Sequence, residues 1–194
     1  MHRDIDHAVE VLQAGGVILY PTDTVWGLGC DATNDEAVAK LFRLKQRDRG
    51  RSMLVLVDSA EAVAKYTAAV PDAAANLLEV SAPEEGVSPK PLTIIYPDAC
   101  NVSRDILADD GSLGIRVTYE RFSNLLCRQL GKPLVSTSAN FSGRPTPKTF
   151  CEIDGKLLEA VDYVCHFRRS DTKPARPSSI IKVGANNEIT IIRS

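Results

Sequence analysis

Apolar positions along this chain follow two patterns, helical spacing and short continuous runs. Residues 5–12 place their apolar side chains at helical spacing ahead of Gly15 and Gly16, which predicts a short amphipathic helix with a glycine stop. Residues 17–20 form a continuous apolar run that Pro21 ends. Such a run is typical of a buried strand that enters a loop.

The two patterns alternate through the rest of the chain. Asn34 is a favourable N-cap for a helix with an apolar stripe. Asp58, with Glu61 three residues later, predicts a capping box for a helix through Tyr66. Further expected elements are a helix starting near Pro71, a helix ended by Gly131, and strands over 53–57, 92–96, 114–117, 134–135, 163–166, 179–183 and 189–192. This alternation, without an internal repeat or a linker, predicts one α/β domain over residues 1–194 with a mixed sheet.

Composition supports an ordinary folded domain. Of the 194 residues, 44% are apolar and 25% charged, which excludes disordered and collagen-like architectures. Lys and Arg number 23 against 25 Asp and Glu, a net charge of −2, which argues against nucleic-acid binding through bulk charge. No apolar run is long enough to span a membrane and residues 1–10 carry no signal-peptide block, so the expected location is the cytoplasm.

The cysteines give poor evidence for a metal site or a disulfide framework. There are five, and no two are spaced as a CxxC pair. We expect reduced thiols, mostly in the core, and no metal site. A P-loop, a GxGxxG fingerprint and an HExxH motif are absent, and His2, His7 and His166 are isolated. Neither a zinc hydrolase nor a dinucleotide enzyme is expected; a Ser-His-Asp hydrolase would need His166 opposite a serine in the fold.

The first candidate segment is the loop over residues 20–29. It joins the predicted strand to Gly27 and Gly29, which allow close backbone approach, and carries Thr22 and Trp26 between them. Such a loop can hold a small polar ligand. It can equally be an ordinary strand-to-helix turn in which Trp26 packs into the core.

Basic residues gather where the helix after Asn34 ends. Lys45 offers a compact charge and Arg47 a planar fork, a combination suited to a polyphosphate. The alternative is a solvated basic face, since a helix C-terminus favours cations in any case. Because both residues lie at an expected exposed helix end, their substitution should cost little stability.

Two further segments combine polar side chains with strands. Residues 136–140 read Ser-Thr-Ser-Ala-Asn directly after a strand, so their polar groups can converge on a phosphate or carboxylate, or merely form a turn. The whole stretch 136–147 is too rich in Ser, Asn, Gly and Pro for regular structure. Arg116 lies inside an apolar strand and needs a partner, either a protein carboxylate or a substrate carboxylate.

Taken in order, six segments resemble the YrdC-like threonylcarbamoyl-AMP synthases. They are residues 20–29, Lys45-x-Arg47, 91–93, 114–117, 136–140 and 176–180, and the resemblance runs from about Val9 to Val183. It implies a twisted α/β fold with a basic concave face. It also implies that L-threonine, bicarbonate and ATP, with Mg²⁺, give threonylcarbamoyl-AMP and pyrophosphate, the first step of threonylcarbamoyladenosine formation in tRNA, with downstream tRNA-modifying proteins as partners.

The resemblance also implies roles for single residues. On the nucleotide side stand Lys45 and Arg47, expected also to be catalytic, with Thr93, Ser138 and Asn140. Where relatives usually read Pro-x-x-Lys-Pro-Leu after the arginine, this chain has residues 48–53 as Asp-Arg-Gly-Arg-Ser-Met. Arg51 must therefore replace the family's lysine at the nucleotide.

The threonine side is implied to comprise Thr22, Trp26, Arg116 and Ser178. Trp26 stands where most relatives have Tyr, so an aromatic wall is kept and a hydroxyl is lost. In the implied reaction the threonine amine forms a carbamate, and a carbamate oxygen displaces pyrophosphate at the α-phosphorus of ATP. This chemistry requires positioning and charge stabilisation and no protein nucleophile.

Two other functions remain as hypotheses at this point. One is an RNA-binding module of the same family with a vestigial nucleotide pocket, supported by Arg43, Lys45, Arg47, Arg49 and Arg51. The other is carbamoyl transfer in hydrogenase maturation, which is the weaker one because the related domains are embedded in much longer chains.

Overall fold

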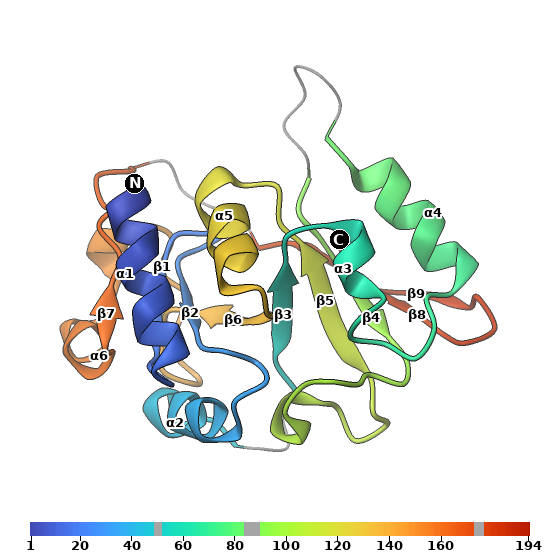
Figure 1. The fold of residues 1–194 in the computed structure, drawn as a ribbon, viewed down its shortest axis with the longest axis horizontal. Coiled ribbons are helices and arrows are strands. Elements are labelled where there is room, and N and C mark those ends of the chain that lie inside the picture. The colour runs from blue at the N-terminus through green and yellow to red at the C-terminus, as the bar shows by residue number, and fades with distance from the viewer. Residues whose placement is uncertain (49–51, 84–89, 173–176) are drawn as a thin grey trace.

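The computed structural model describes residues 1–48, 52–83, 90–172 and 177–194, and within them nine strands form one twisted sheet (Figure 1). The strand order is β7-β1-β2-β6-β3-β5-β4-β8-β9. In chain order the strands are β1 (Ile18–Tyr20), β2 (Gly27–Gly29), β3 (Leu54–Val57), β4 (Leu92–Tyr96), β5 (Leu113–Val117), β6 (Leu134–Ser138), β7 (Tyr163–Val164), β8 (Ser179–Val183) and β9 (Ile189–Arg193). The pairs β1–β7, β3–β5 and β4–β8 are parallel and the others antiparallel, so the predicted mixed sheet is confirmed.

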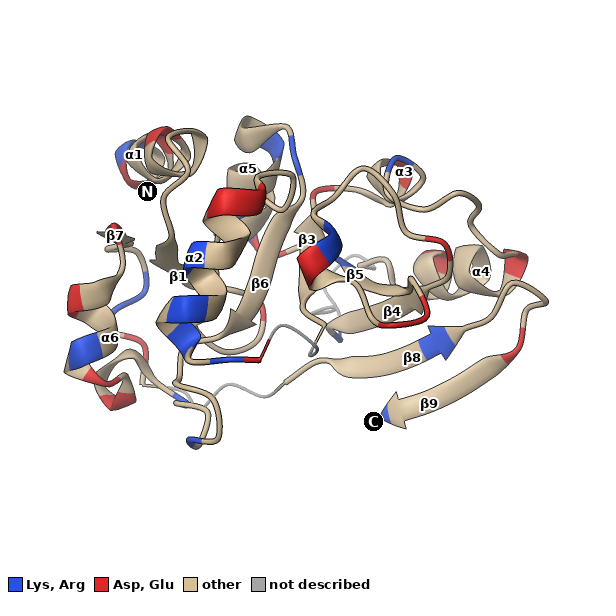
Figure 2. Cartoon of the chain, turned by 90° about the horizontal axis from the view of Figure 1, so that it is seen from below, with Lys and Arg blue, Asp and Glu red and all other residues tan. Residues whose placement is uncertain are grey.

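The helices pack against this sheet on both sides. They are α1 (His2–Gln13), α2 (Asp35–Lys45), α3 (Ala60–Val63), α4 (Asp72–Ser81), α5 (Arg121–Leu130) and α6 (Gly155–Ala160), with short 3-10 turns η1 (Arg104–Ile106) and η2 (Phe150–Glu152). Figure 2 shows β8 and β9 at the edge of the sheet that lies away from α1 and α6. The described residues contain no helix with the length and apolar character needed to cross a membrane.

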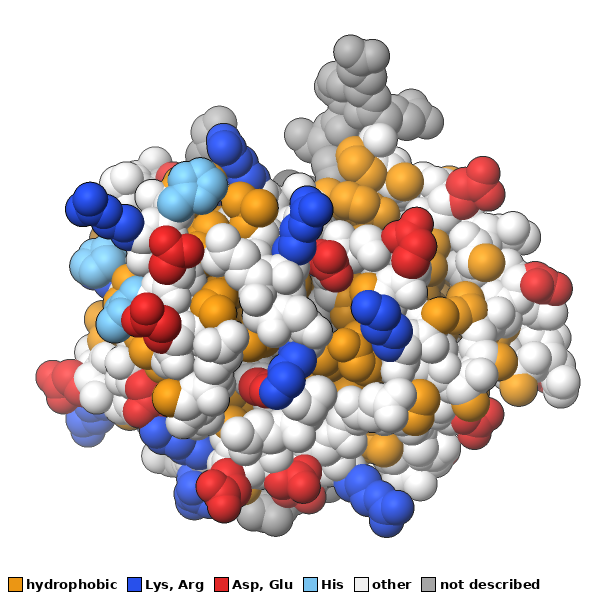
Figure 3. Space-filling model, viewed as in Figure 1, with side chains coloured by type: hydrophobic (Ala, Val, Ile, Leu, Met, Phe, Trp, Pro, Cys, Tyr) orange, Lys and Arg blue, Asp and Glu red, His pale blue; other side chains and the backbone are white. Residues whose placement is uncertain are grey.

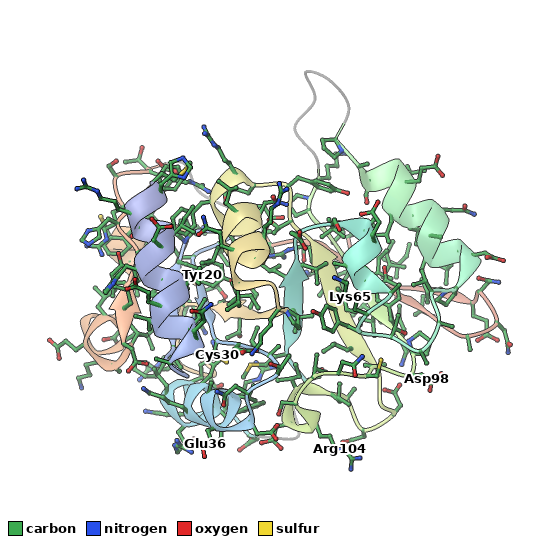
Figure 4. The ribbon with its side chains drawn as sticks, in the orientation of Figure 1. Tyr20, Cys30, Glu36, Lys65, Asp98 and Arg104 are labelled. Atoms are coloured by element: carbon green, nitrogen blue, oxygen red, sulfur yellow. The ribbon has the colours of Figure 1, made fainter. Side chains whose placement is uncertain are left out.

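Strand register assigns the core to two faces, because alternate residues of a strand point in opposite directions. Tyr20, Leu56 and Leu134 form one apolar cluster with α1 and α5, and Figure 4 shows Tyr20 in the interior beside α1. Val55 and Val57 point the other way and pack with α2 and α3. The face of Leu56 is the one that also carries the cavity described below.

Local signals explain most element ends. The Asn34 side chain accepts a hydrogen bond from the amide of Ala37 and so caps α2, as expected. Gly131 ends α5 in the left-handed conformation at φ 67°. The predicted capping box is wrong, however: Ser59 caps α3 and the helix ends at Val63. Asp58 is still in the loop after β3, so the hydroxyl one residue later takes the capping position.

Two strand segments differ from the expectation of irregular structure. Strand β2 lies within the predicted loop 20–29, and β6 extends through Ser138 into the predicted irregular stretch. Both follow from mutual pairing, since Gly27 and Leu28 of β2 pair with Ser138 and Thr137 of β6. A Cβ atom at Gly29 would lie 2.6 Å from the Val135 carbonyl oxygen. The glycine therefore allows close approach of a neighbouring strand, not of a ligand.

The cysteines are all unpaired thiols. Cys30, Cys127 and Cys165 are buried, Cys100 is half-buried and Cys151 is exposed. Burial raises the pKa of each buried thiol, which keeps it protonated and unreactive. The expectation that the cysteines lie mostly in the core is confirmed.

Candidate active site

The face of the sheet that α1 and α5 cover in part also carries an open cavity of about 210 Å³. Leu54 of β3, Ser136 of β6 and Ile180 of β8 contribute to its lining. Leu54 pairs directly with Ser136 across the strands. The backbone turn before β2 forms another wall through Thr24, Val25 and Gly27. The site is thus assembled from segments far apart in the sequence.

Positive charge dominates this cavity. Arg47, Arg116 and Arg193 line it, and the described residues around it include no carboxylate. Burial, and then the charge of Arg116, lower the pKa of Arg193, so the two guanidinium groups act on each other. Three arginines in a lining that contains no described acid attract anions, even though Arg116 is also paired with Asp23 from outside that lining. The geometry is suited to a ligand that carries carboxylate or phosphate groups.

Arg116 is paired with a protein carboxylate from behind the cavity. Its Nη2 lies 3.1 Å from the Asp23 Oδ1 and donates a hydrogen bond to the Thr24 hydroxyl at 3.3 Å. Burial raises the pKa of the Asp23 carboxyl, although the Arg116 charge acts in the opposite direction. The Arg116 Nε is buried and has no hydrogen-bond partner among the described residues. Because a guanidinium group has five N–H donors, this pairing leaves donors for a ligand.

Ser178 and Thr93 meet at the opposite wall. Their hydroxyls are hydrogen bonded to each other at 2.9 Å, and both side chains are buried. Ser178 lines the arginine cavity, whereas Thr93 lines an adjoining hollow of about 580 Å³. Thr93, implied on the nucleotide side, therefore directly contacts Ser178, implied on the threonine side.

Arg193 is a site residue that the sequence reasoning missed. Its Nε donates a hydrogen bond to the Ser178 carbonyl at 2.9 Å. The pairing of β8 with β9 shifts register between Ile180 and Ile181, and such a bulge redirects side chains on the strand that carries it. The only signal in the sequence was an arginine following the apolar residues of a predicted strand, the pattern that had singled out Arg116.

Ser138 is the last residue of β6 and Asn140 follows it in the next turn, and the two side chains face different hollows. Ser138 lines the arginine cavity, and Asn140 lines a second hollow of about 660 Å³. Thr146 lines both, so the two hollows adjoin. The Asn140 Nδ2 donates to the carbonyls of Phe141 and Arg144, each at 2.9 Å, while its buried Oδ1 has no partner among the described residues. Asn140 therefore offers a ligand an acceptor and no side-chain donor.

Lys45 differs from the prediction of an exposed phosphate-binding residue. Its side chain is 2% exposed and lines none of the cavities described here. The reason is the left-handed Gln46 that caps α2 at φ 52°: Lys45 remains on the inner side of the helix, and Arg47 turns toward the cavity. Burial, and then the charge of Arg47, lower the pKa of Lys45 to about 7.

Thr22 and Trp26 also lie behind the cavity surface. The Thr22 hydroxyl donates to the Val25 carbonyl at 2.7 Å and accepts from the Thr24 amide at 3.0 Å, so it shapes the turn that presents Thr24. Trp26 is buried in the core, with its ring centroid 4.9 Å from that of Phe150. Its neighbours Val25 and Gly27 line the cavity in its place. Trp26 thus differs from the predicted wall of the threonine pocket and matches the alternative of core packing.

Some of the basic residues considered from the sequence are not described. Arg49, Arg51 and the first residue of segment 176–180 lie outside the described residues. Arg47 is described, and its Nη2 donates to the Ser52 carbonyl at 2.8 Å. The space-filling view in the orientation of Figure 1, by contrast, shows acidic and basic side chains interspersed on that surface (Figure 3). Excess positive charge is therefore a property of the cavity and not of that surface.

Comparison with known proteins agrees with this geometry. A family model named Sua5_yciO_yrdC and described as "Telomere recombination" matches residues 10–194. A threonylcarbamoyl-AMP synthase of Xanthomonas campestris pv. campestris (strain B100) is 34% identical over 161 residues, which are 83% of this chain and 84% of the relative. One from Vibrio campbellii is 31% identical over 188 residues, 94% of this chain and 100% of the relative.

A solved structure confirms the fold. The crystal structure of E. coli YciO superposes with a TM-score of 0.83 at 26% sequence identity, covering 100% of this chain and 90% of that one. The fold implied by the resemblance is therefore confirmed. Since the family model also spans nearly the whole chain, this protein belongs to the Sua5/YciO/YrdC family.

Proposed function

We propose that this protein is an L-threonylcarbamoyladenylate synthase, which converts L-threonine, bicarbonate and ATP into threonylcarbamoyl-AMP and pyrophosphate. The observation that carries the proposal is the cavity with three arginines and no described acid, placed beside Ser138 and Asn140. Two anionic substrates need such a site. The enzyme name of relatives at 31–34% identity supports it.

The volumes of the hollows suggest how two substrates fit. The arginine cavity, at about 210 Å³, is smaller than usual for a site that holds a whole nucleotide, and its size suits an amino acid with a phosphate group. Threonine is placed with its carboxylate on Arg116 and near Ser178. The nucleoside then extends past Thr146 into the 660 Å³ hollow, where the Asn140 Oδ1 accepts from a ribose hydroxyl or a base amino group.

The chemistry requires no nucleophile from the protein. The neutral amine of threonine adds to carbon dioxide with loss of a proton, or to bicarbonate with loss of water, and forms a carbamate. One carbamate oxygen then attacks the α-phosphorus as pyrophosphate leaves. Arg47 and Arg193 lie where charge on the phosphate oxygens would be stabilised, and the rigid strand ends would hold the reacting atoms within attack distance.

Magnesium fits this arrangement only as a partner of ATP. Because no described carboxylate lines the arginine cavity, the ligands of Mg²⁺ would be phosphate oxygens and water, with the Ser and Thr hydroxyls nearby. When bound, the ion would neutralise charge on the phosphates. The protein's own arginines would supply the rest of that stabilisation.

The described part of the structure accounts otherwise for two of the five basic residues that support an RNA-binding module, while Arg49 and Arg51 lie outside it. Of the basic run that this module depends on, Lys45 is buried and Arg47 points into the cavity, which leaves Arg43 as an exposed described member. Binding of RNA through phosphates weakens steeply with salt. A titration of ATP and of RNA at rising salt therefore separates the two functions.

The decisive experiment is pyrophosphate release from ATP and bicarbonate, with and without L-threonine. Release that depends on threonine is the expected result. Release that is equal without threonine, or no release under any condition, contradicts the proposal. Transfer of the product to tRNA by downstream modifying proteins is part of the same proposal, and threonylcarbamoyl-AMP isolated from the reaction tests its first step.

A further inference from the structure

Lys45 joins the end of α2 to the turn that follows β6. Its Nζ donates hydrogen bonds to the carbonyl oxygens of Ser138 at 2.5 Å and Asn140 at 2.9 Å. Its own carbonyl accepts from the Ser142 amide at 2.9 Å. One residue thus ties the helix to the turn through three hydrogen bonds. Two of the residues it holds, Ser138 and Asn140, are those whose side chains face the substrate hollows.

The position of the ammonium group excludes contact with a ligand in those hollows. Lys45 is 2% exposed and lines none of them. Its Nζ is bound to main-chain oxygens of the turn, whereas the side chains of Ser138 and Asn140 reach the hollows. The Asn140 amide also donates to the Ser138 carbonyl at 2.9 Å, so Lys45 adds a second donor there and a donor to the Asn140 carbonyl. A buried carbonyl without a donor is costly, so the Asn140 end of the turn depends most on this side chain for its conformation.

We propose that Lys45 is a positioning residue, which fixes the turn from Ser138 to Asn140 from behind and so sets where the Ser138 hydroxyl and the Asn140 Oδ1 meet the nucleotide. The inference rests on the proposed function for the identity of the ligand. It reassigns Lys45 from a direct nucleotide contact, and Arg47 alone of the pair lines the cavity.

Burial gives this role a property that a phosphate-binding lysine would not have. The pKa of Lys45 is lowered to about 7, so both protonation states are populated near neutral pH. A neutral amine still has two N–H groups and satisfies both carbonyls. The turn is therefore held across neutral pH, whereas a direct contact to phosphate would weaken as the charge is lost.

A double-mutant cycle separates positioning from direct contact, because two residues that act through one structure show non-additive effects. Lys45→Met keeps the length of the side chain and removes its donors. We expect it to raise the KM for ATP in the threonine-dependent assay about tenfold alone, and less than about twofold when Ser138→Ala and Asn140→Ala are already present. Arg47→Met is the matched control. Its fold-increase in the KM for ATP should be the same in the wild type and in the Ser138→Ala, Asn140→Ala background. If Lys45→Met also raises the KM for ATP by the same factor in both backgrounds, the proposal is overturned.

Two further measurements test the proposal without relying on the turnover of Lys45→Met. In the wild type, ATP affinity measured by calorimetry should be unchanged from pH 7 to 9, and a progressive loss over that range overturns the proposal. In Lys45→Met, hydrogen exchange should speed up at the amides of Asn140 and Ser142, and not at Gly131 at the end of α5. Unchanged exchange at the two turn amides also overturns it. Absence of ATP binding by the wild type would instead contradict the proposed function, and the exchange result would still report on the turn.

Discussion

At the scale of single residues, Arg116 shows how far chemistry alone can predict a site. A cation in an apolar strand needs a partner, and the structure supplies the Asp23 carboxylate 3.1 Å away. Sequence reasoning could predict the need but not the partner, because Asp23 comes from a turn that reaches β5 only through the tertiary fold. Lys45 and Arg47 illustrate the limit of the same reasoning, since the left-handed Gln46 between them sends one inward and one outward.

The Asp23–Arg116 pair predicts a particular pattern of stability. Arg116→Met leaves a buried carboxylate unpaired, and breaking a buried ion pair from one side costs about 3 to 5 kcal/mol. In an Asp23→Asn background the same substitution should cost much less, because no charge is left behind. Urea unfolding of the two single variants and the double variant measures the difference. Equal costs in both backgrounds would mean that Asp23 does not depend on Arg116.

The double variant also isolates the ligand role of Arg116. With the stability cost reduced, the KM for L-threonine in the pyrophosphate assay should still rise about tenfold or more, since a charge-assisted contact contributes about 1.5 to 3 kcal/mol. Asp23→Asn alone is the control and should leave the arginine available. A double variant with the KM of this control would place the threonine carboxylate elsewhere.

Asn140 and Ser138 should differ in the size of their effects. Asn140→Ala removes two hydrogen bonds that hold the turn as well as the free acceptor, whereas Ser138→Ala removes one hydroxyl that water can replace. We expect both to lower threonine-dependent pyrophosphate release, and Asn140→Ala to do so more. The rates of the two folded variants test this order. A larger effect of Ser138→Ala would show that its hydroxyl contacts the reacting groups.

At the scale of elements, apolar runs and helical stripes predicted the strands and helices that have them. Strands β4 and β8 match their predicted bounds. Strand β2 and the end of β6 were missed because glycine, serine and threonine carry no apolar pattern. They are strands because each pairs with the other and β2 is also flanked by β1. This is information that only the assembled sheet contains.

Glycine spacing within β2 predicts a sharp contrast between two substitutions. A Cβ atom at Gly29 would lie 2.6 Å from the Val135 carbonyl oxygen, a backbone atom that cannot move aside, whereas at Gly27 the nearest atom is a Thr22 methyl at 3.3 Å. Overpacking costs about 1 to 3 kcal/mol, so Gly29→Ala should lose at least about 2 kcal/mol and Gly27→Ala about 1 or less. Urea unfolding compares the two. Similar losses would mean that β6 can shift away from β2.

The edge strand β9 should matter for activity and little for stability. All five of its residues are exposed, yet Arg193 lines the cavity. Arg193→Met should raise the KM for ATP about tenfold while shifting the unfolding midpoint only slightly. Ile191→Thr, on the same strand and away from the cavity, is the matched control and should leave the KM unchanged. Equal KM values in the two variants would remove Arg193 from the site.

At the scale of the whole molecule, the site exists only because segments far apart in the sequence meet on one face of the sheet. Resemblance to a family brought most of its members together from the sequence, and Arg116, Ser138 and Ser178 do line one cavity. Arg193 was missed because its local signal, an arginine after a short apolar run, does not show that it reaches the cavity. Trp26, just before β2, packs in the core next to Phe150, which matches the alternative of core packing. The direction of both side chains follows from the assembled fold, which composition and spacing do not encode.

The same dependence on distant contacts predicts how the fold responds to acid. Asp4 of α1 accepts hydrogen bonds from the Tyr163 hydroxyl at 2.6 Å and the Phe167 amide at 2.8 Å, and so ties the first helix to the segment after β7. Burial raises the pKa of Asp4, but these bonds and that of the His166 amide outweigh it, and the pKa lies below its ordinary value. A carboxyl with a lowered pKa stabilises the fold above its unfolded pKa, near 3.9.

That contribution should be lost as pH falls below about 4 through the lowered pKa of the folded state. Asp4→Asn should therefore lower the free energy of unfolding at pH 7. The difference in this free energy between the variant and the wild type should become smaller as pH approaches 3. Asp6→Asn, exposed on the outer side of the same helix, is the control. It should change neither the stability at pH 7 nor the pH dependence of stability. Urea unfolding at pH 7, 5 and 3 provides the measurement. An Asp4→Asn deficit that stays constant down to pH 3 would show that the carboxylate charge does not hold α1 to the sheet, and that apolar packing against α5 is sufficient.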